Sequence, residues 1–370
     1  MVRAAVLAAV GQPLEIRDDV EVDEPGPGEV QVRMVASGVC HSDRSARDGV
    51  MLVPTPVVLG HEGAGVVERV GPGVTGVAPG DPILVSWVPQ CGTCFHCERQ
   101  EGHLCDHAAV SMGGAMLDGT TRMRSGGLPL RQLAASGTFA EVVVVPGVSV
   151  VPLPADIDLP VAALLGCSVL TGVGAVFNTS RVERGDTVAV VGCGGVGLNV
   201  VQGARLAGAG RIIAVDASPP KLDLAARFGA TDAVDASSGD PVSAVMALTG
   251  QRGADVVFEV VGRQATIEQA VAMTRRGGQT VLVGIPAMDV TLAVPAFLGL
   301  VLSGRTISGC WYGSSNVRRD VPRLLRLYRA GRLELDALVS RTIPLDGVND
   351  ALDALGGGEG ARTVIVHRGA

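Results

Sequence analysis

The sequence predicts an α/β protein with two units, a β-rich one and a doubly wound parallel sheet. The chain has 370 residues, which is too long for one ordinary hydrophobic core. Residues 1–150 read as short strands separated by Gly/Pro turns, which is typical of a compact β-rich unit. After about Cys167 the sequence pattern changes to predicted strands that alternate with predicted helices. Near-continuous Val/Ile/Ala strands of this kind indicate a parallel sheet covered by helices on both faces.

Taken in order, the first unit begins with an apolar strand within Met1–Leu14. This stretch carries no cleavage pattern of a signal peptide. Turn residues such as Gly71-Pro72-Gly73 separate the later strands, which are expected over Glu29–Ala36, Gly63–Val70, Pro82–Val88 and Phe139–Val145.

In the second unit, apolar strands alternate with amphipathic helices. Its strands are expected over Thr187–Val191, Ile212–Val215, Val256–Val260 and Gln279–Val283, and its helices over Leu198–Ala207, Pro219–Phe228 and Thr266–Met273. A last stretch from Val317 to Ala370 contains an expected helix, Val321–Ala330, and an expected strand, Thr363–His367.

The composition of the chain argues against nucleic-acid binding and against a membrane span. Apolar residues make up 47% of the chain, and the net charge of −7 leaves no basic footprint for a nucleic acid. Leu159–Ser180 is uncharged for long enough to span a membrane. However, Pro160 and several glycines interrupt it and charges flank it closely. We therefore expect a cytoplasmic protein without a membrane span or a nucleic-acid partner.

Four of the eight cysteines crowd into one short loop, as Cys91-x2-Cys94-x2-Cys97-x7-Cys105. Short x2 spacings let backbone turns aim successive sulfur atoms at one point, and four thiolates with no open position form a structural zinc site. An iron–sulfur cluster or two disulfides are the alternatives. His96 and His103 lie in the same loop and are expected to be bystanders.

A second set of metal ligands is expected from Cys40, His61 and Cys167. A lone cysteine is usually a small buried side chain, but the surroundings of these residues favour a ligand role. In Cys40-His41-Ser42-Asp43, Ser42 could hydrogen-bond a metal-bound oxygen and Asp43 could orient an imidazole. Two thiolates and one imidazole leave a fourth position for substrate, as in a catalytic zinc site that polarises an alcohol or aldehyde.

A dinucleotide fingerprint completes the set of motifs. Gly192-x-Gly194-x-x-Gly197 follows a strand and opens a helix, expected to begin near Leu198, and Asp216 ends the next strand. The glycines let the backbone approach a pyrophosphate at the helix N-terminus. Asp216 would bind the ribose hydroxyls and repel a 2′-phosphate, which favours NAD over NADP. Lys221 either reaches that ribose or is an ordinary solvated helix residue.

With these motifs, the whole chain resembles the zinc-containing medium-chain alcohol dehydrogenases, most of all the liver-type and formaldehyde-dehydrogenase branch. Further matches are Gly60-His61-Glu62-Gly63, Asp118 to Arg122, Gly166-Cys167-Ser168, Thr171 to Gly174, Gly309 to Gly313 and Ala361-Arg362-Thr363. The resemblance implies a GroES-like β-rich catalytic domain over 1–168 and 312–370 and a Rossmann NAD-binding domain over 169–311. It also implies two zinc ions per chain, NAD, and a homodimer paired through Arg305 to Gly313.

The resemblance also implies roles for individual residues. Ser42 accepts the substrate proton, Asp43 supports the zinc histidine, and Glu62 lies behind the metal. The residues implied in cofactor binding are His41, Gly192, Gly194, Gly195, Val196, Gly197, Asp216, Lys221 and Arg362. Ser45 occupies the outer end of the proton relay, where liver-type enzymes often have a histidine. The relay therefore ends either at Ser45 or in water.

The apolar segment Gly49-Val50-Met51-Leu52-Val53 stands where glutathione-dependent members carry acidic residues. This favours a hydrophobic primary or aryl alcohol or aldehyde as substrate. Met51, Trp87, Leu133 and Leu298 are candidates for the substrate wall, with ordinary core packing as the alternative for each. Other hypotheses are a formaldehyde dehydrogenase acting on the adduct of another thiol, a member that retains NAD(H) and uses an external acceptor, and a binding protein that only keeps the fold.

Overall fold

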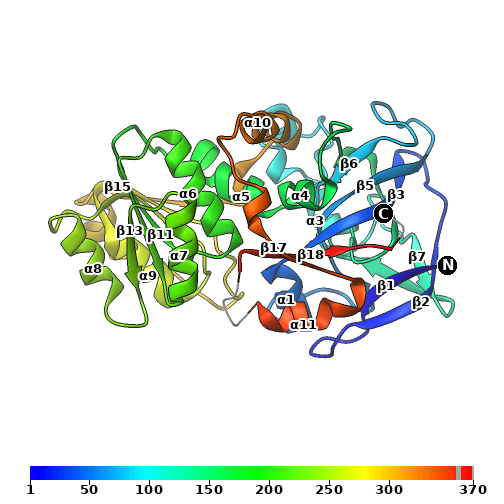
Figure 1. The fold of residues 1–370 in the computed structure, drawn as a ribbon, viewed down its shortest axis with the longest axis horizontal. Coiled ribbons are helices and arrows are strands. Elements are labelled where there is room, and N and C mark those ends of the chain that lie inside the picture. The colour runs from blue at the N-terminus through cyan, green and yellow to red at the C-terminus, as the bar shows by residue number, and fades with distance from the viewer. Residues whose placement is uncertain (356–359, 369–370) are drawn as a thin grey trace.

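The computed structural model describes residues 1–355 and 360–368 and has two parts side by side (Figure 1). The part on the left of Figure 1 is a parallel sheet between helices, and the part on the right is built from a small barrel and a mixed sheet. Both termini lie in the right-hand part. The α/β class expected from the sequence is confirmed, including the parallel sheet of the second unit.

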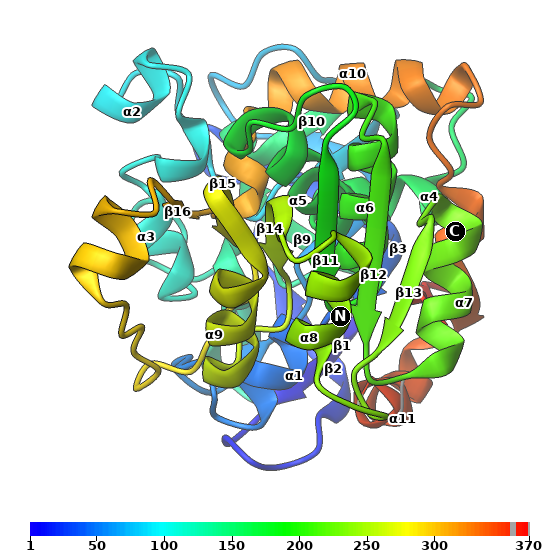
Figure 2. The same ribbon diagram turned by 90° about the vertical axis from the view of Figure 1, so that its left-hand side faces the viewer.

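The parallel sheet has six strands in the order β13-β12-β11-β14-β15-β16, and Figure 2 views this part directly. The chain starts at the middle strand, winds outward to one edge, and then crosses back to build the other half. The carboxyl ends of β11 and β14 therefore meet at a switch point, where open α/β sheets bind ligands. The strands are β11 (Thr187–Val191), β12 (Arg211–Asp216), β13 (Asp232–Asp235), β14 (Ala254–Glu259), β15 (Thr274–Leu282) and β16 (Thr306–Gly309).

Helices cover both faces of this sheet because alternate side chains of each strand point to opposite sides. On one face Val188 and Val190 pack with Leu198 of α6. On the other face Ala189 and Val191 pack with Val245 of α8. The helices are α6 (Gly195–Ala207) and α7 (Pro219–Phe228) on the first face, and α8 (Pro241–Leu248) and α9 (Gln264–Met273) on the second.

The other part joins both ends of the chain. Its closed barrel runs β1-β2-β7-β8-β4, and its seven-stranded sheet runs β10-β6-β5-β3-β18-β17 with β9 paired to β3. β18 from the end of the chain pairs antiparallel with β3. The strands are β1 (Val2–Leu7), β2 (Glu15–Val22), β3 (Glu29–Val39), β4 (Val57–Val58), β5 (Glu62–Val70), β6 (Pro82–Val85), β7 (Met123–Ser125), β8 (Leu128–Gln132), β9 (Val142–Pro146), β10 (Val150–Pro152), β17 (Val339–Ile343) and β18 (Arg362–Val366).

Several further helices connect the strands, and three of them, the ones that carry Ser42, Met112 and Thr171, contribute residues to the central cleft. They are α1 (His41–Arg47), α2 (Phe95–Glu98), α3 (Ala108–Met112), α4 (Leu159–Ala163), α5 (Ser168–Gly174), α10 (Val317–Arg329) and α11 (Val348–Ala354). Among residues 1–355 and 360–368, no single helix is long and apolar enough to cross a membrane. Leu159–Gly166 and Ser168–Thr179 meet the length and composition criteria only as a pair bent by 53°.

The structure corrects several element boundaries. The helix expected to begin near Leu198 begins at Gly195, because the glycine loop itself forms the first helical turn despite the low helix propensity of glycine. The strand expected over Pro82–Val88 ends at Val85, and the helix expected from Val321 begins at Val317, where Asn316 caps it. The expected domain limits, 1–168 with 312–370 and 169–311, remain a prediction.

A metal and dinucleotide cleft between the two parts

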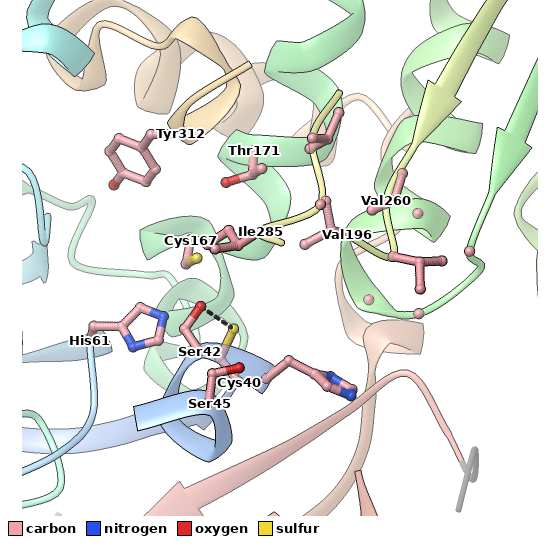
Figure 3. A pocket seen from close by; sticks show the side chains of 18 of the residues that line it. Cys40, Ser42, Ser45, His61, Cys167, Thr171, Val196, Val260, Ile285 and Tyr312 are labelled. Carbon is pink, nitrogen blue, oxygen red and sulfur yellow. Dashed lines mark hydrogen bonds between the residues drawn. The ribbon is translucent and has the colours of Figure 1, made fainter. Parts of the chain in front are cut away.

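A cleft of about 280 Å³ lies between the parallel sheet and the barrel part (Figure 3). One end is lined by the predicted metal ligands and the other by the glycine loop. The switch point of the parallel sheet thus opens directly onto residues from the opposite part. This arrangement can bring a dinucleotide and a metal-held molecule together.

Cys40, His61 and Cys167 meet at one end of the cleft although three different elements carry them. Cys40 precedes the first turn of α1, His61 precedes β5, and Cys167 precedes α5. Together with Glu62, their potential ligand atoms all lie within 4.8 Å of one another, and all four residues are buried. Figure 3 shows His61 facing the two sulfur atoms.

Asp43 connects two of these ligands. Its Oδ1 accepts hydrogen bonds from the backbone N–H of Gly60, at 3.0 Å, and from His61 Nδ1, at 3.1 Å. Its Oδ2 accepts the backbone N–H of Cys40 at 3.1 Å. Because Nδ1 of His61 is occupied in this way, Nε2 remains as the available ligand atom.

The electrostatics of this end of the cleft favour a bound cation. The hydrogen bond with Cys167 lowers the pKa of the Cys40 thiol well below its ordinary value, while the same bond and burial raise the pKa of Cys167. Burial works against protonation of His61, but the charge and hydrogen bond of Asp43 outweigh it and raise the His61 pKa. Thiolate and imidazole donors, buried with one carboxylate behind them, fit a zinc ion.

Glu62 and Arg362 lie behind the ligands. Glu62 Oε1 lies 3.5 Å from Arg362 Nη2, and both side chains are buried. Burial raises the pKa of Glu62 to about 7. Arg362 also borders the glycine loop, since a Cβ at Gly195 would lie 2.5 Å from its Nε. The guanidinium therefore stands between the metal end and the dinucleotide end of the cleft.

Ser42, Ser45 and His41 line the cleft along α1. Ser42 Oγ lies 3.9 Å from Cys40 Sγ, the contact that Figure 3 marks with a dashed line. His41 is exposed at the rim of the cleft, and partial desolvation of its imidazole lowers its pKa. The three side chains thus form one wall between the metal ligands and the dinucleotide end.

The four-cysteine loop forms a separate cluster. Cys91 Sγ lies 3.9 Å from Cys97 Sγ, and Cys94 Sγ lies 3.9 Å from Cys105 Sγ. A tetrahedron with zinc–sulfur bonds near 2.3 Å has edges of about 3.8 Å, so the spacing fits zinc. Burial works against the thiolate of Cys91, but hydrogen bonds from Thr93 and the Cys94 backbone lower its pKa to about 6. Across the described chain all eight cysteines are free thiols.

The glycine loop leaves room for a dinucleotide. Gly192 has φ +96°, and a Cβ at Gly197 would lie 1.8 Å from the Gly192 carbonyl oxygen, so folding itself requires both glycines. A Cβ at Gly194 would meet no atom within 4 Å, so this glycine instead leaves open space in the cleft. Asp216 accepts the backbone N–H of Cys193 at 2.7 Å and of Ser218 at 2.9 Å. Val196, Asp216 and Lys221 also line the cleft.

The remaining wall of the cleft is apolar and aromatic. The ring centroids of Trp87 and Trp311 are 5.0 Å apart and nearly perpendicular, and those of Trp87 and Tyr312 are 4.6 Å apart. Of the expected wall residues, Met51, Trp87 and Leu133 line the cleft. Leu298 does not line it and is instead 64% exposed.

Sequence reasoning missed Trp311, Tyr312, Thr171, Met112 and Ile285, all of which line the cleft. One signal was present for the aromatic pair. Trp311 and Tyr312 follow β16 closely, and ligands bind beyond the carboxyl ends of parallel strands. Thr171 lies in the stretch Thr171 to Gly174 that carries the family resemblance, although no role was assigned to it there. Met112 and Ile285 carry no local signal, because only the packing of distant segments brings them to the cleft.

Comparison with known proteins agrees with this geometry. Residues 26–155 match the family model described as the alcohol dehydrogenase GroES-like domain, and residues 195–330 match that of the zinc-binding dehydrogenases. The chain is 41% identical to an S-(hydroxymethyl)glutathione dehydrogenase of Escherichia coli, covering 98% of this chain and 99% of the relative.

Solved structures agree as well. A benzyl alcohol dehydrogenase from Acinetobacter calcoaceticus superimposes with a TM-score of 0.93 at 31% identity, covering 99% of both chains. An alcohol dehydrogenase zinc-binding domain protein from Burkholderia ambifaria also gives a TM-score of 0.93, at 37% identity, covering 99% of this chain and 98% of the other.

Proposed function

The chain belongs to the zinc-containing medium-chain alcohol dehydrogenases, an oxidoreductase family that uses zinc and NAD, and we propose that it oxidises aryl and other hydrophobic primary alcohols to aldehydes. One observation carries the proposal. The three ligands Cys40, His61 and Cys167 stand in the same cleft as the edge-to-face pair Trp87 and Trp311. A flat aromatic substrate whose hydroxyl faces the ligands would pack against these rings.

The charges of the cleft support a hydrophobic substrate. Among the described residues that line the cleft, three are acidic, lysine or arginine residues, namely Asp216, Lys221 and Arg362. We assign these three charged side chains to cofactor binding, not to contact with the substrate. Met51, Met112 and Leu133 give the substrate end an apolar surface. An alcohol without charged groups loses little hydration there and gains apolar contact.

The metal, when bound, supplies a Lewis acid that favours the deprotonated alcohol and polarises the aldehyde carbonyl. Ser42 Oγ lies beside Cys40 and is placed to take the hydroxyl proton from the substrate. Ser45, one turn further along α1, offers the next hydroxyl on the way to solvent. The aromatic and apolar wall excludes water from the reacting carbon, and the nicotinamide end of the cofactor belongs opposite that carbon.

We assign NAD rather than NADP to this chain because of Asp216. The carboxylate ends β12, and its side chain lines the cleft at the dinucleotide end. Two backbone N–H groups hold it in place, so it cannot readily turn away from a ribose. A 2′-phosphate at that position would meet a fixed negative charge.

A second candidate is oxidation of a thiol adduct of formaldehyde, which the name of the 41% identical relative suggests. The adduct of glutathione would bring two carboxylates and an amine into the substrate end. The described residues lining that end provide no charged partner for these groups. An adduct with a less charged thiol remains compatible with the apolar wall.

We further propose a homodimer formed through β16, in a reducing cytoplasm that keeps the eight thiols free. β16 is the edge of the parallel sheet and is paired with β15 on its inner side. The segment just before it exposes a large apolar surface. Its most exposed side chains are Met288, Phe297, Leu298, Val301 and Leu302. Light scattering on the purified protein tests the dimer, and a monomer at micromolar concentration would overturn it.

The substrate assignment is tested with the holoenzyme and a panel of alcohols, with NADH absorbance as the readout. Benzyl alcohol and longer aliphatic alcohols should be oxidised with a higher kcat/KM than ethanol, with and without added thiol. Activity that appears only with formaldehyde and a thiol would replace this proposal by the second candidate. Nicotinamide found in the protein as purified would instead indicate a member that retains its cofactor.

Ser42→Ala provides the matched variant for this test, with Ser45→Ala beside it. The first should lower kcat strongly, because it removes the hydroxyl nearest the ligands. The second should have a smaller effect, since water can replace an outer relay group. Equal effects would contradict the order of the relay.

A further inference from the structure

The aromatic wall of the cleft stands on a strained turn. Tyr312, Gly313 and Ser314 have φ values of 53°, 65° and 47°, so three consecutive residues are left-handed. Only glycine adopts this conformation freely, and left-handed non-glycine residues persist where the surrounding structure holds them. Trp311 directly precedes the turn, and Tyr312 is its first residue.

Gln90 binds the backbone immediately after this turn at two points. Its Nε2 donates to the carbonyl oxygen of Ser315 at 3.0 Å, and its Oε1 accepts the backbone N–H of Val317 at 3.1 Å. Gln90 is only 5% exposed, so water cannot easily replace either bond. The amide therefore fixes the chain between the turn and the start of α10.

Gln90 also belongs to the four-cysteine loop, since it directly precedes Cys91. A Cβ at Gly102 of the same loop would lie 2.5 Å from Gln90 Oε1, so the loop packs tightly against the amide from the other side. A second bond, from Asn316 Nδ2 to Gln100 Oε1 at 2.9 Å, joins the loop to the same segment. The loop is thus attached to the segment that carries the aromatic wall.

The other end of the turn is attached to the catalytic ligands. Tyr312 OH donates to the carbonyl oxygen of Gly166 at 2.6 Å, and Gly166 directly precedes Cys167. Figure 3 shows Tyr312 and Cys167 along the same cleft. The aromatic wall therefore lies between two fixed points, the ligand segment on one side and Gln90 on the other.

We propose that Gln90 is a positioning residue for the substrate, through which the four-cysteine loop holds Trp311 and Tyr312 in place. The four-cysteine loop would then contribute to substrate recognition as well as to the stability of the fold. The proposal deepens the proposed function, because it concerns the wall assigned there to the alcohol. Its physical content is that releasing Gln90 lets the left-handed turn relax and moves the tryptophan.

The chain offers a direct probe and a matched control. Its two tryptophans are Trp87 and Trp311, so in a Trp87→Phe background all tryptophan emission comes from Trp311. Gln202 is another buried glutamine that holds backbone at two points, donating to the Glu334 carbonyl oxygen at 3.0 Å and accepting the Glu334 N–H at 2.8 Å. It also donates to Asn199 Oδ1 at 3.2 Å. It does not line the cleft. Gln90→Leu and Gln202→Leu therefore each remove two bonds to the backbone at different places, and Gln202→Leu removes one side-chain bond more.

In the Trp87→Phe background, Gln90→Leu should shift the Trp311 emission to longer wavelength and raise its quenching by acrylamide about twofold, because the wall opens to solvent. In the chain with both tryptophans, the same substitution should raise KM for benzyl alcohol about tenfold and change KM for ethanol much less. Gln202→Leu should lower thermal stability similarly and leave emission, quenching and both KM values near those of its parent.

Identical spectra and KM values for the two glutamine variants would overturn the proposal. Loss of zinc from Gln90→Leu with an unmoved Trp311 would also overturn it, because Gln90 would then serve only the metal loop. If the enzyme oxidises no alcohol at all, the proposed function fails on its own. The emission and quenching of Trp311 still test Gln90 in that case.

Discussion

Replacement of Asp43 by asparagine should weaken one metal site and spare the other. The carboxylate is fully buried and accepts three hydrogen bonds, two at Oδ1 and one at Oδ2. Asparagine has one oxygen, which can keep the two bonds from Gly60 and His61. Its amino group must then face the backbone N–H of Cys40, donor against donor. Cys40 and the start of α1 should therefore move away from the other ligands.

The magnitude follows from this geometry. A lost hydrogen bond to a buried charged group costs about 1.5–3 kcal/mol. Loss of a partner that orients a metal ligand lowers metal affinity roughly 10- to 100-fold, which corresponds to about 1.4–2.7 kcal/mol. The two energy ranges agree. Asp43→Asn should therefore release the metal at Cys40, His61 and Cys167 at roughly 10- to 100-fold lower chelator concentration.

The assay is zinc retained by the purified protein after equilibration with graded chelator, read beside thermal unfolding. One of two zinc ions should shift and the other, at the four-cysteine loop, should not. Asp48→Asn is the control, because Asp48 ends the same helix but bonds Arg44 and Arg47 at the surface. Unchanged release of both ions from a folded Asp43→Asn protein would refute the reasoning.

Three further predictions concern other parts of the molecule. Cys167→Ala should abolish alcohol oxidation while NADH still binds in a fluorescence titration, and an active variant would remove Cys167 from the ligand set. Asp216→Ala should raise kcat/KM for NADP relative to NAD about tenfold or more, because a fixed negative charge no longer opposes the 2′-phosphate; an unchanged ratio would show that the carboxylate does not select the cofactor. Burial lowers the pKa of His367 to about 4, against an ordinary value of 6.5. The unfolded chain therefore takes up the proton first as the pH falls, and stability should fall by about 3 kcal/mol between pH 6.5 and pH 4. His367→Gln should flatten that slope in urea unfolding, whereas an equally steep slope in this variant would assign it to other groups.

Local chemistry explains what could be predicted from the sequence. The x2 spacing of Cys91, Cys94 and Cys97 brings the sulfur atoms together whatever surrounds the loop. The positive φ of Gly192 and the end of β12 at Asp216 likewise depend on neighbouring residues. Apolar strands that alternate with helices indicate a sheet buried on both faces, so the parallel sheet was predictable too.

Element boundaries were less predictable, because tertiary contacts override propensity at helix ends. α6 begins at Gly195 although glycine disfavours helices, since the loop must bring its backbone close to β11. Leu298 has the apolar side chain expected of a residue in the substrate wall. However, it lies on the exposed segment before β16 and does not line the cleft.

The sequence by itself determined which side chains can hold metal and dinucleotide, because those properties reside in residue type and short spacing. Only the tertiary structure decided that Cys40, His61 and Cys167 face a common point and that Trp311 and Tyr312 stand beside it. Those contacts form between segments far apart in the chain, so they depend on how the barrel part packs against the parallel sheet. The same packing placed Gln90 against the strained turn, a contact for which the sequence carries no periodicity and no motif.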